Sequence, residues 1–320
     1  MDNREMPSYA FVLLDVFTNR PLAGNPLPVV PQATGLSDDT MQALAREFNA
    51  SETTFVLPPA DPRATRRLRC FSPTHEVFGA GHNALGAWWA IVAQGDVKVP
   101  DGETRLWQQL GDRVLAVDVT SDQGALVRVA MTQGEPAITP GIPDLELLAA
   151  ALGLDENALS VPGLHPQVIS TGATHLLVPA RSLADLTQVR VDAARLTELA
   201  QPLGCEGCYL FCLETLEPGA VAHARAFFPG IGIPEDPATG SAAGPLGAYL
   251  VARQRAPQGQ WITIEQGDEM RRPSRIEVRI SGERVEVAGR CAIVAEGRLT
   301  PPLALRHRTS PHPPASRGPR

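Results

Sequence analysis

The chain has 320 residues, a hydrophobic content of 43%, a charged content of 20% and a formal net charge of −7. This length is enough for two domains of ordinary size, and the acidic balance argues against a nucleic-acid partner. The chain starts with polar residues rather than a signal-peptide core, and it lacks the apolar run of ~20 residues that would predict a membrane span. Five irregularly spaced cysteines do not suggest a disulfide framework, so we expect a cytoplasmic protein.

The first part of the chain alternates predicted strands and helices. Apolar and β-branched runs predict strands at 11–17, 27–30, 51–57 and 67–71. Ser37 is the expected cap of a helix that has acidic residues in its first turn and Asn49 at its end. A second helix is expected from 82 to 93, with the pair Trp88-Trp89 in its core packing, and strands follow between 111 and 131.

The second part of the chain repeats this order of elements. The predicted helices are 143–152, 191–203 and 241–254, and the predicted strands are 168–170, 175–178, 207–214, 220–227, 261–265, 275–280, 284–287 and 291–295. We therefore predict two α+β halves, 1–131 and 132–290, with a strand near 291–299 returning to the first half. In each half a curved, mostly antiparallel sheet or barrel surrounds a central helix. The Pro- and Arg-rich segment 301–320 is predicted to be a disordered tail.

Two stretches share one pattern: residues 69–87, RCFSPTHEVFGAGHNALGA, and residues 226–250, AFFPGIGIPEDPATGSAAGPLGAYL, which Arg225 precedes. Each runs from Arg-x-Phe-x-Pro through an acidic residue to a glycine and a polar residue that open an apolar helix. A helix start binds anions through its unpaired N–H groups, and glycine there lets a ligand approach closely. Pro245 is expected in the first turn, where its missing N–H costs nothing. The two helix starts, at Gly81 and Gly240, predict one shared site for a small carboxylate.

Three side chains could perform acid–base chemistry in such a site: Glu52, His82 and Asp236. Ser241 is expected to cap the second helix and to contact the substrate, and Asn25 is either a plain turn residue or a further contact. Gly79-x-Gly81 lacks the third glycine of a dinucleotide motif. The three cysteines between 205 and 212 resemble small apolar residues of a buried strand, without a second Cys/His pair at zinc spacing. We expect neither a metal nor a cofactor.

These motifs together resemble the phenazine-biosynthesis F isomerases (PhzF-like proteins), which share the diaminopimelate epimerase fold. The resemblance extends from Phe11 to about Gly297 and includes Asp15-Val16-Phe17, Gly24-Asn25-Pro26, the run NASETTFV at 49–56, Ala80-Gly81-His82 and the run EDPATGSAAGPL at 235–246. It implies two pseudo-symmetric halves and a homodimer. It also implies a cofactor-independent isomerase that moves a proton on trans-2,3-dihydro-3-hydroxyanthranilate.

The resemblance also implies roles for individual residues. Glu52 is the acid–base group, His82, Asp236 and Ser241 support it, and Gly81 and Gly240 supply backbone N–H groups. Epimerase and racemase relatives use two cysteines just before the helix-start glycines, where this chain has Ala80 and Thr239. This difference favours a proton shuttle by one carboxyl group over a two-base inversion. Two alternatives stay open: an isomerase or epimerase of another small amino-acid-like carboxylate, and a non-catalytic small-molecule binder on the same fold.

Overall fold

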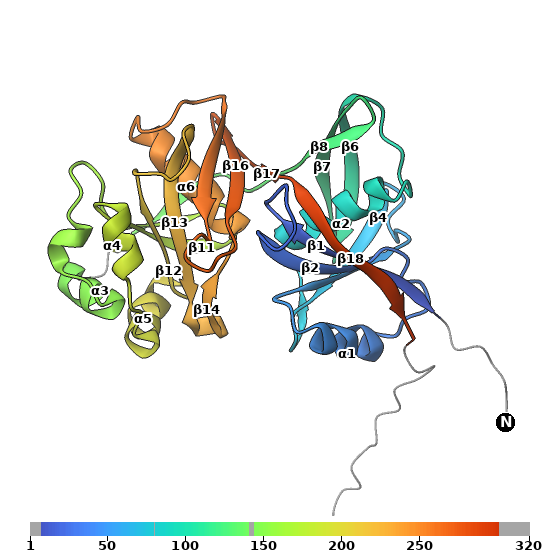
Figure 1. Ribbon diagram of the computed structural model, residues 1–320, viewed down its shortest axis with the longest axis horizontal. Helices are drawn as coiled ribbons and strands as arrows, with labels where there is room; N and C mark the ends of the chain where they lie inside the picture. Colours follow the sequence, from blue (N-terminus) through green and yellow to red (C-terminus); the bar gives the residue numbers. More distant parts are fainter. Residues whose placement is uncertain (1–7, 80, 141–143, 301–320) are drawn as a thin grey trace, which may run out of the picture.

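The computed structural model describes residues 8–79, 81–140 and 144–300. The predicted tail at 301–320 and Ala80 lie outside these ranges. Two halves lie side by side, each a strongly curved sheet with one long helix inside it, α2 on the right and α6 on the left of Figure 1. We keep the predicted boundaries near 131 and 290 as a working division of the chain.

The first half contains two helices and eight strands within the described ranges. The helices are α1 (Asp38–Phe48) and α2 (His82–Ala93); the strands are β1 (Tyr9–Val16), β2 (Asn25–Val30), β3 (Thr53–Leu57), β4 (Arg66–Phe71), β5 (Glu76–Val77), β6 (Gly102–Leu110), β7 (Arg113–Asp122) and β8 (Ala125–Thr132). As predicted, Ser37 caps α1 by accepting from the Thr40 N–H, and Asn49 ends it in the left-handed conformation.

The second half has the same order, with additional short helices on its outer side. Its helices are α3 (Leu145–Leu152), α4 (Leu183–Gln188), α5 (Ala193–Ala200) and α6 (Gly240–Ala252); its strands are β9 (Ala137–Thr139), β10 (Gln167–Ser170), β11 (Thr174–Pro179), β12 (Cys208–Cys212), β13 (Ala220–Phe228), β14 (Ile233–Asp236), β15 (Trp261–Gln266), β16 (Ser274–Ser281), β17 (Arg284–Gly289) and β18 (Cys291–Leu299). Short 3₁₀ turns cover 156–159, 201–203 and 229–231.

The strand pairing is the same in both halves, which confirms the predicted pseudo-symmetric fold. In the first half β1, β2, β3, β4, β6, β7 and β8 are neighbours in that order, and β2–β3 and β4–β6 are the parallel pairs. In the second half β10, β11, β12, β13, β15, β16 and β17 follow the same order, with β11–β12 and β13–β15 parallel. All other pairs in these two series are antiparallel.

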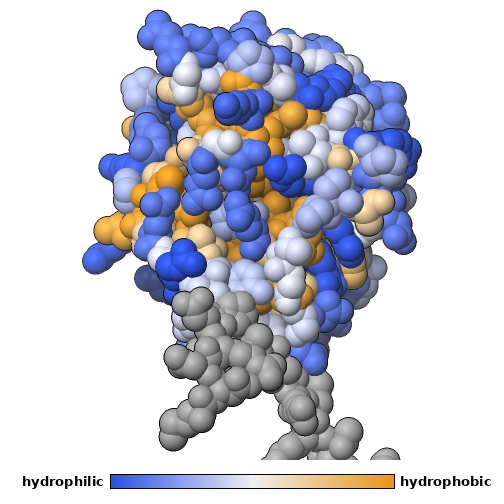
Figure 2. Space-filling model, turned by 90° about the vertical axis from the view of Figure 1, so that its right-hand side faces the viewer, coloured by the Kyte–Doolittle hydropathy of each residue, from blue (hydrophilic) through white to orange (hydrophobic). Residues whose placement is uncertain are grey.

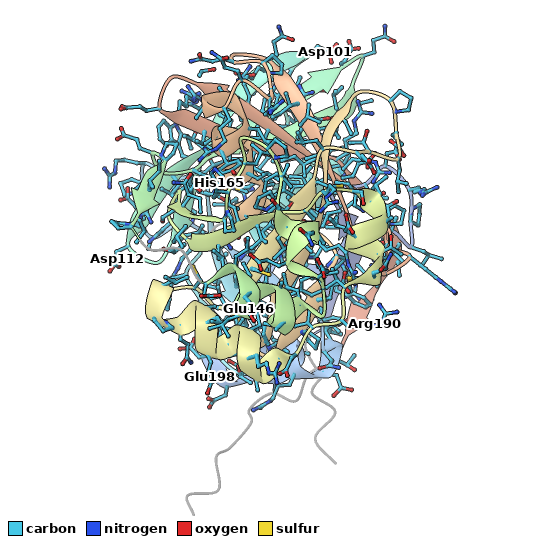
Figure 3. All side chains as sticks on the ribbon, turned by 90° about the vertical axis from the view of Figure 1, so that its left-hand side faces the viewer. Asp101, Asp112, Glu146, His165, Arg190 and Glu198 are labelled. Atoms are coloured by element: carbon cyan, nitrogen blue, oxygen red, sulfur yellow. The ribbon has the colours of Figure 1, made fainter. Side chains whose placement is uncertain are left out.

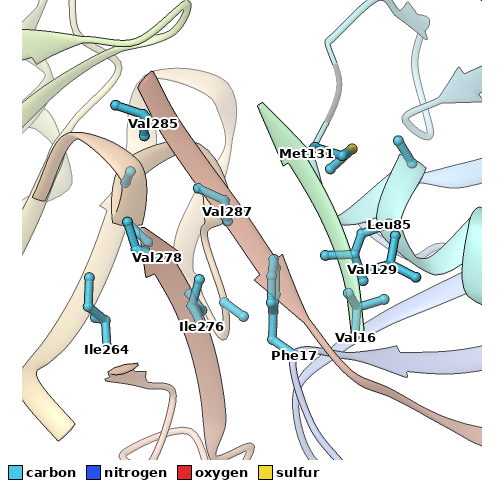
Figure 4. Packing of buried hydrophobic residues seen from close by; sticks show 14 of the residues in the cluster. Val16, Phe17, Leu85, Val129, Met131, Ile264, Ile276, Val278, Val285 and Val287 are labelled. Atoms are coloured by element: carbon cyan, nitrogen blue, oxygen red, sulfur yellow. The ribbon is translucent and has the colours of Figure 1, made fainter. Parts of the chain in front are cut away.

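The halves exchange strands at their junction. β9, which follows the last strand of the first half, pairs with β10, and β18, which follows β17 of the second half, pairs with β1 (Figure 1 shows β18 beside β1). β8 and β17 pair directly with each other, so that Val287 lies opposite Met131 in the register (Figure 4). The first half therefore has an edge completed by β18, and backbone hydrogen bonds of β1 with β18 and of β8 with β17 join the two halves.

The two central helices are apolar on nearly all sides, as expected of a helix enclosed by a sheet. Leu85, Trp88 and Ile91 of α2 are completely buried, and so are Leu246 and Leu250 of α6. The buried indole Nε1–H of Trp88 donates to Gln108 Oε1 over 2.9 Å, which satisfies its one polar atom. Neighbouring Trp89 is only partly buried.

Two predictions about α6 are wrong. The N-cap residue is Thr239, and Ser241 is the second residue of the helix, so Ser241 does not cap it. Pro245 is the sixth residue of α6 and therefore lies beyond the first turn. Its missing N–H leaves the Ser241 carbonyl oxygen without its helical donor. The apolar pattern placed the helix correctly but did not locate its first residue.

The outer surfaces are dominated by polar residues. Glu146 of α3 and Glu198 of α5 are exposed on the far side of the second half, where exposed His165 also lies (Figure 3). The opposite end of the molecule, formed by the first half, shows apolar residues in the middle of a polar face (Figure 2). Within the described ranges, no helix has the length and apolar character needed to cross a bilayer.

His223 of β13 is buried between two carboxylates. Its Nδ1 lies 2.9 Å from Glu265 Oε2, and its Nε2 lies 3.1 Å from Glu269 Oε1. Burial by itself would lower the pKa of His223, but the bonds with Glu269 and Glu265 outweigh it and raise that pKa above 6.5. The charged imidazolium therefore stabilises the folded chain.

We predict that the free energy of unfolding contains a term that depends on His223 protonation. Because the folded pKa is raised, this stabilisation is fully present below about pH 6.5 and is lost as pH rises through the folded pKa. His223→Gln should cost roughly 3 kcal/mol at low pH, as breaking a buried ion pair does, and less above the folded pKa. Urea unfolding at a series of pH values measures this difference.

The control is His165→Gln, which changes an exposed histidine of the same half. It should follow the wild-type pH dependence. An unchanged pH dependence in His223→Gln would contradict the role assigned to the buried pair.

Candidate active site

Glu52 lies between the starts of the two central helices. It immediately precedes β3, and its Oε2 is 3.8 Å from Nδ1 of His82, the first residue of α2. The Glu52 side chain is 20% exposed and that of His82 is 13% exposed. Asp236, near the start of α6, is close enough for its charge to act on Glu52. The structure thus brings the three predicted acid–base residues together, although they are up to 184 positions apart.

Burial shifts both Glu52 and His82 towards their uncharged forms. The pKa of Glu52 is raised from 4.5 to about 8, first by burial and then by the negative charge of Asp236, while a bond with Asn83 opposes the change. Burial lowers the pKa of His82 to about 4. At pH values between about 4 and about 8 the 3.8 Å contact between Glu52 and His82 is therefore not an ion pair. The distance is also too long for a hydrogen bond.

Two atoms of this pair are buried without a hydrogen-bond partner in the described part of the chain: Glu52 Oε2 and His82 Nε2. A buried polar atom left unpaired costs about 1–3 kcal/mol, so native proteins rarely retain one without a purpose. These atoms are suited to exchange a proton with, or donate one to, a bound molecule.

Asp236, at the end of β14, is held from both halves. Its Oδ1 accepts from Asn25 Nδ2 over 3.0 Å, and its Oδ2 accepts from Thr239 Oγ1 over 2.5 Å. Burial raises the pKa of Asp236 to about 6, and these two bonds oppose that rise. At neutral pH the group is therefore mainly a carboxylate, with each oxygen already accepting one hydrogen bond.

Asn25, a candidate substrate contact, is buried and linked to the second half. Its amide also donates to the Ala238 carbonyl oxygen over 2.9 Å, so both amide hydrogens are used within the protein. Its Oδ1 is 3.5 Å from Ser51 Oγ, at the limit of a hydrogen bond, and is the one atom with capacity left for a ligand.

Glycine is present at the starts of α2 and α6 for different physical reasons. At Gly81 an added Cβ would meet nothing closer than Asn83 Oδ1 at 3.9 Å, so space is open beside the backbone. At Gly240 it would lie 2.9 Å from the Phe17 ring, so this glycine is required by packing between the halves. The backbone N–H groups of His82 and Ser241 are in the first turns and have no acceptor within their helices.

Several supporting residues were not predicted from the sequence. Gln266 is completely buried, accepts from the Thr239 N–H over 3.0 Å and donates to the Asp236 carbonyl oxygen over 2.7 Å. Tyr209 completes this network by donating to Gln266 Oε1 over 2.9 Å. Asn83 Oδ1 accepts from the N–H groups of Gly81 and Ala84. Nothing in the sequence indicates the contact of Gln266 with Thr239, because the two residues are 27 positions apart.

The cysteines behave as apolar core residues. Cys205, Cys208 and Cys212 are buried and unpaired, and burial raises the pKa of the Cys208 thiol to about 12. Among the residues with described positions, no three His, Cys, Asp or Glu side chains are arranged to hold a metal ion.

Comparison with known proteins identifies the family. Residues 14–297 match the model of the phenazine biosynthesis-like (PhzC-PhzF) family. The chain belongs to this family. A trans-2,3-dihydro-3-hydroxyanthranilate isomerase of Pseudomonas aeruginosa is 36% identical over 297 residues, which cover 91% of this chain and 99% of that protein.

Solved structures agree with the assignment. A PhzF-family phenazine biosynthesis protein of Bacillus anthracis is 26% identical, with a TM-score of 0.82 over 92% of this chain and 99% of the other. A hydroxyproline epimerase of Agrobacterium vitis has a TM-score of 0.60, with 91% of each chain covered; at 14% identity it shows only the shared fold. This PhzF-like chain is therefore an isomerase or epimerase.

We predict that Asp236→Asn lowers the pKa of Glu52. Removing the neighbouring negative charge should move it from about 8 towards, but not to, 4.5, because burial is the larger cause of the shift. A ¹³C NMR titration of the Glu52 carboxyl carbon, assigned by comparison with Glu52→Gln, measures the change. The exposed residue Asp112 provides the control, since Asp112→Asn should leave the pKa where it is (Figure 3). A Glu52 pKa unaltered by Asp236→Asn would contradict the coupling.

Proposed function

We propose that this PhzF-like protein is a cofactor-independent isomerase in which Glu52 moves a proton between two carbon atoms of its substrate. The supporting observation is the buried, unpartnered Oε2 of Glu52, on a carboxyl group whose pKa of about 8 allows both protonation states near neutral pH. A group that must act as base and then as acid works best with such a pKa.

The proposed reaction starts with Glu52 as the carboxylate. It removes a proton from one ring carbon, the C–H electron pair becomes part of a shifted double bond, and the resulting carboxylic acid returns the proton to a second carbon on the same face. The carboxyl group ends as it began, and no oxidant or further reactant is needed. Neutral His82 is placed to stabilise the displaced electrons with a hydrogen bond, 3.8 Å from Glu52.

The rest of the site is proposed to hold the substrate. First-turn N–H groups at Gly81-His82 and Gly240-Ser241 provide donors for a carboxylate. The Asp236 carboxylate, fixed by Asn25 and Thr239, is suited to accept from an amine or hydroxyl group. We propose trans-2,3-dihydro-3-hydroxyanthranilate as the substrate because it combines these groups and because the Pseudomonas aeruginosa relative is named for this activity.

A two-base epimerase is the alternative, and one contact disfavours it. Thr239, at the position of the second cysteine of epimerases, donates its hydroxyl hydrogen to Asp236 and cannot act as a base. Two further alternatives are tested by the assays below: the substrate is a different small amino-acid-like carboxylate, or the protein binds a small molecule without catalysis. The homodimer, the cytoplasmic location and the disordered tail stay predictions.

Glu52→Gln should reduce turnover of trans-2,3-dihydro-3-hydroxyanthranilate by at least ~10²-fold while leaving the fold intact. Consumption of the substrate is followed by absorbance, and circular dichroism checks folding. Glu146→Gln, an exposed change on α3, is the matched control and should keep full activity (Figure 3). Near-normal turnover by Glu52→Gln would refute the assignment. Loss of chirality of a free amino acid in deuterated water would select the epimerase. No turnover of either compound by the folded wild type would leave a different small amino-acid-like carboxylate or a binding role.

The pH profile of kcat/KM provides a separate test of the base-first order. The active form of the free enzyme carries ionised Glu52, so kcat/KM should rise with pH and level off above about 8. A profile that falls through this range would mean that the substrate reacts first with the protonated acid.

A further inference from the structure

A pocket of about 340 Å³ is lined by residues of both halves at their junction. Its charged lining residues are Arg20 after β1, Glu217 between β12 and β13, Arg275 and Glu277 of β16, and Arg290 just after β17. None of the candidate active-site residues belongs to this lining. The pocket is therefore a separate feature that the proposed reaction does not use.

The charges in this pocket are unbalanced. Arg275 is paired with Glu217 at 2.7 Å and with Asp268 at 3.1 Å, and Glu277 is paired with Arg128. Arg20 and Arg290 form no ion pair with any residue whose position is described. Both carboxylates of the lining are thus paired with other arginines. No described residue forms an ion pair or side-chain hydrogen bond with the guanidinium of Arg20 or Arg290, and the charge of Arg20 acts on Glu217 only at longer range.

Backbone hydrogen bonds join the Phe17–Thr18 segment of the pocket to the second half. The Phe17 carbonyl oxygen accepts from the Arg275 N–H over 2.7 Å, and the Thr18 N–H donates to the Arg290 carbonyl oxygen over 3.1 Å. Phe17 itself is buried with φ of 64°, a left-handed conformation that is rare for a bulky residue and is retained only where its surroundings impose it. Arg20 and Arg290, both exposed residues, line the pocket from different halves.

We propose that this pocket binds a small dianion, either a phosphate or a compact dicarboxylate, between Arg20 and Arg290. Guanidinium groups bind phosphate and carboxylate oxygens through paired, charge-assisted hydrogen bonds. The anion joins the two halves. It also lies beside Phe17, whose ring packs against Gly240 at the start of α6, so the pocket is in contact with the helix that supports the candidate active site.

Isothermal titration calorimetry of the whole chain tests the proposal, with inorganic phosphate and succinate as separate probes. We expect saturable binding of at least one probe to the wild type, and the stronger of the two identifies the anion class. The double variant Arg20→Gln/Arg290→Gln should bind the probe at least about tenfold more weakly, because it loses one or more charge-assisted hydrogen bonds. The matched control, Arg46→Gln/Arg113→Gln, removes the same charge from exposed positions elsewhere and should bind normally.

Two results would overturn the proposal: no saturable binding of either probe, or equal binding by wild type and the Arg20→Gln/Arg290→Gln variant. The second result would place the anion elsewhere, for example at the helix starts. Circular dichroism of each variant shows that the fold is kept. The titration involves no turnover, and Glu52→Gln should bind the probe like the wild type, so the outcome does not depend on the proposed reaction.

Discussion

The hydrogen bond between Asn25 and Asp236 joins residues 211 positions apart and links the two halves at the candidate site. A buried carboxylate is stable only when donors replace the water that it has lost. Here one donor comes from Asn25 in the first half and the other from Thr239 in the second. The position of Asp236 therefore depends on correct docking of both halves, and so does the electrostatic field at Glu52.

Strand pairing across the junction joins the two halves through backbone hydrogen bonds. β18 completes the sheet of the first half beside β1, β9 lies beside β10, and β8 pairs with β17 across the junction. Phe17 packs against Gly240 and Gly289 at the same place, with no room for a side chain at either glycine. These backbone hydrogen bonds and the Phe17 packing hold Glu52, His82 and Asp236 in their arrangement in this structure.

The site combines opposite pKa shifts from a common cause. Burial raises the pKa of Glu52 and lowers that of His82, because in each case it disfavours the charged form. Asp236 escapes full neutralisation because two donors stabilise its charge, and that remaining charge adds to the shift at Glu52. A carboxyl group able to change protonation state near neutral pH thus follows from low solvation and one fixed negative neighbour.

The sequence by itself determined the local elements and the residue types of the site. Caps and apolar spacing are short-range, so α1 with Ser37 and Asn49, and α2 at His82–Ala93, could be predicted correctly. β6, whose exposed and partly buried residues lack a clear apolar pattern, and the six-residue α4 were missed, because tertiary packing rather than local propensity stabilises them. Only the tertiary structure decided the partners of Asn25 and Gln266, the true start of α6 and the pKa of Glu52. Each depends on contacts or burial created by segments that are distant in the chain.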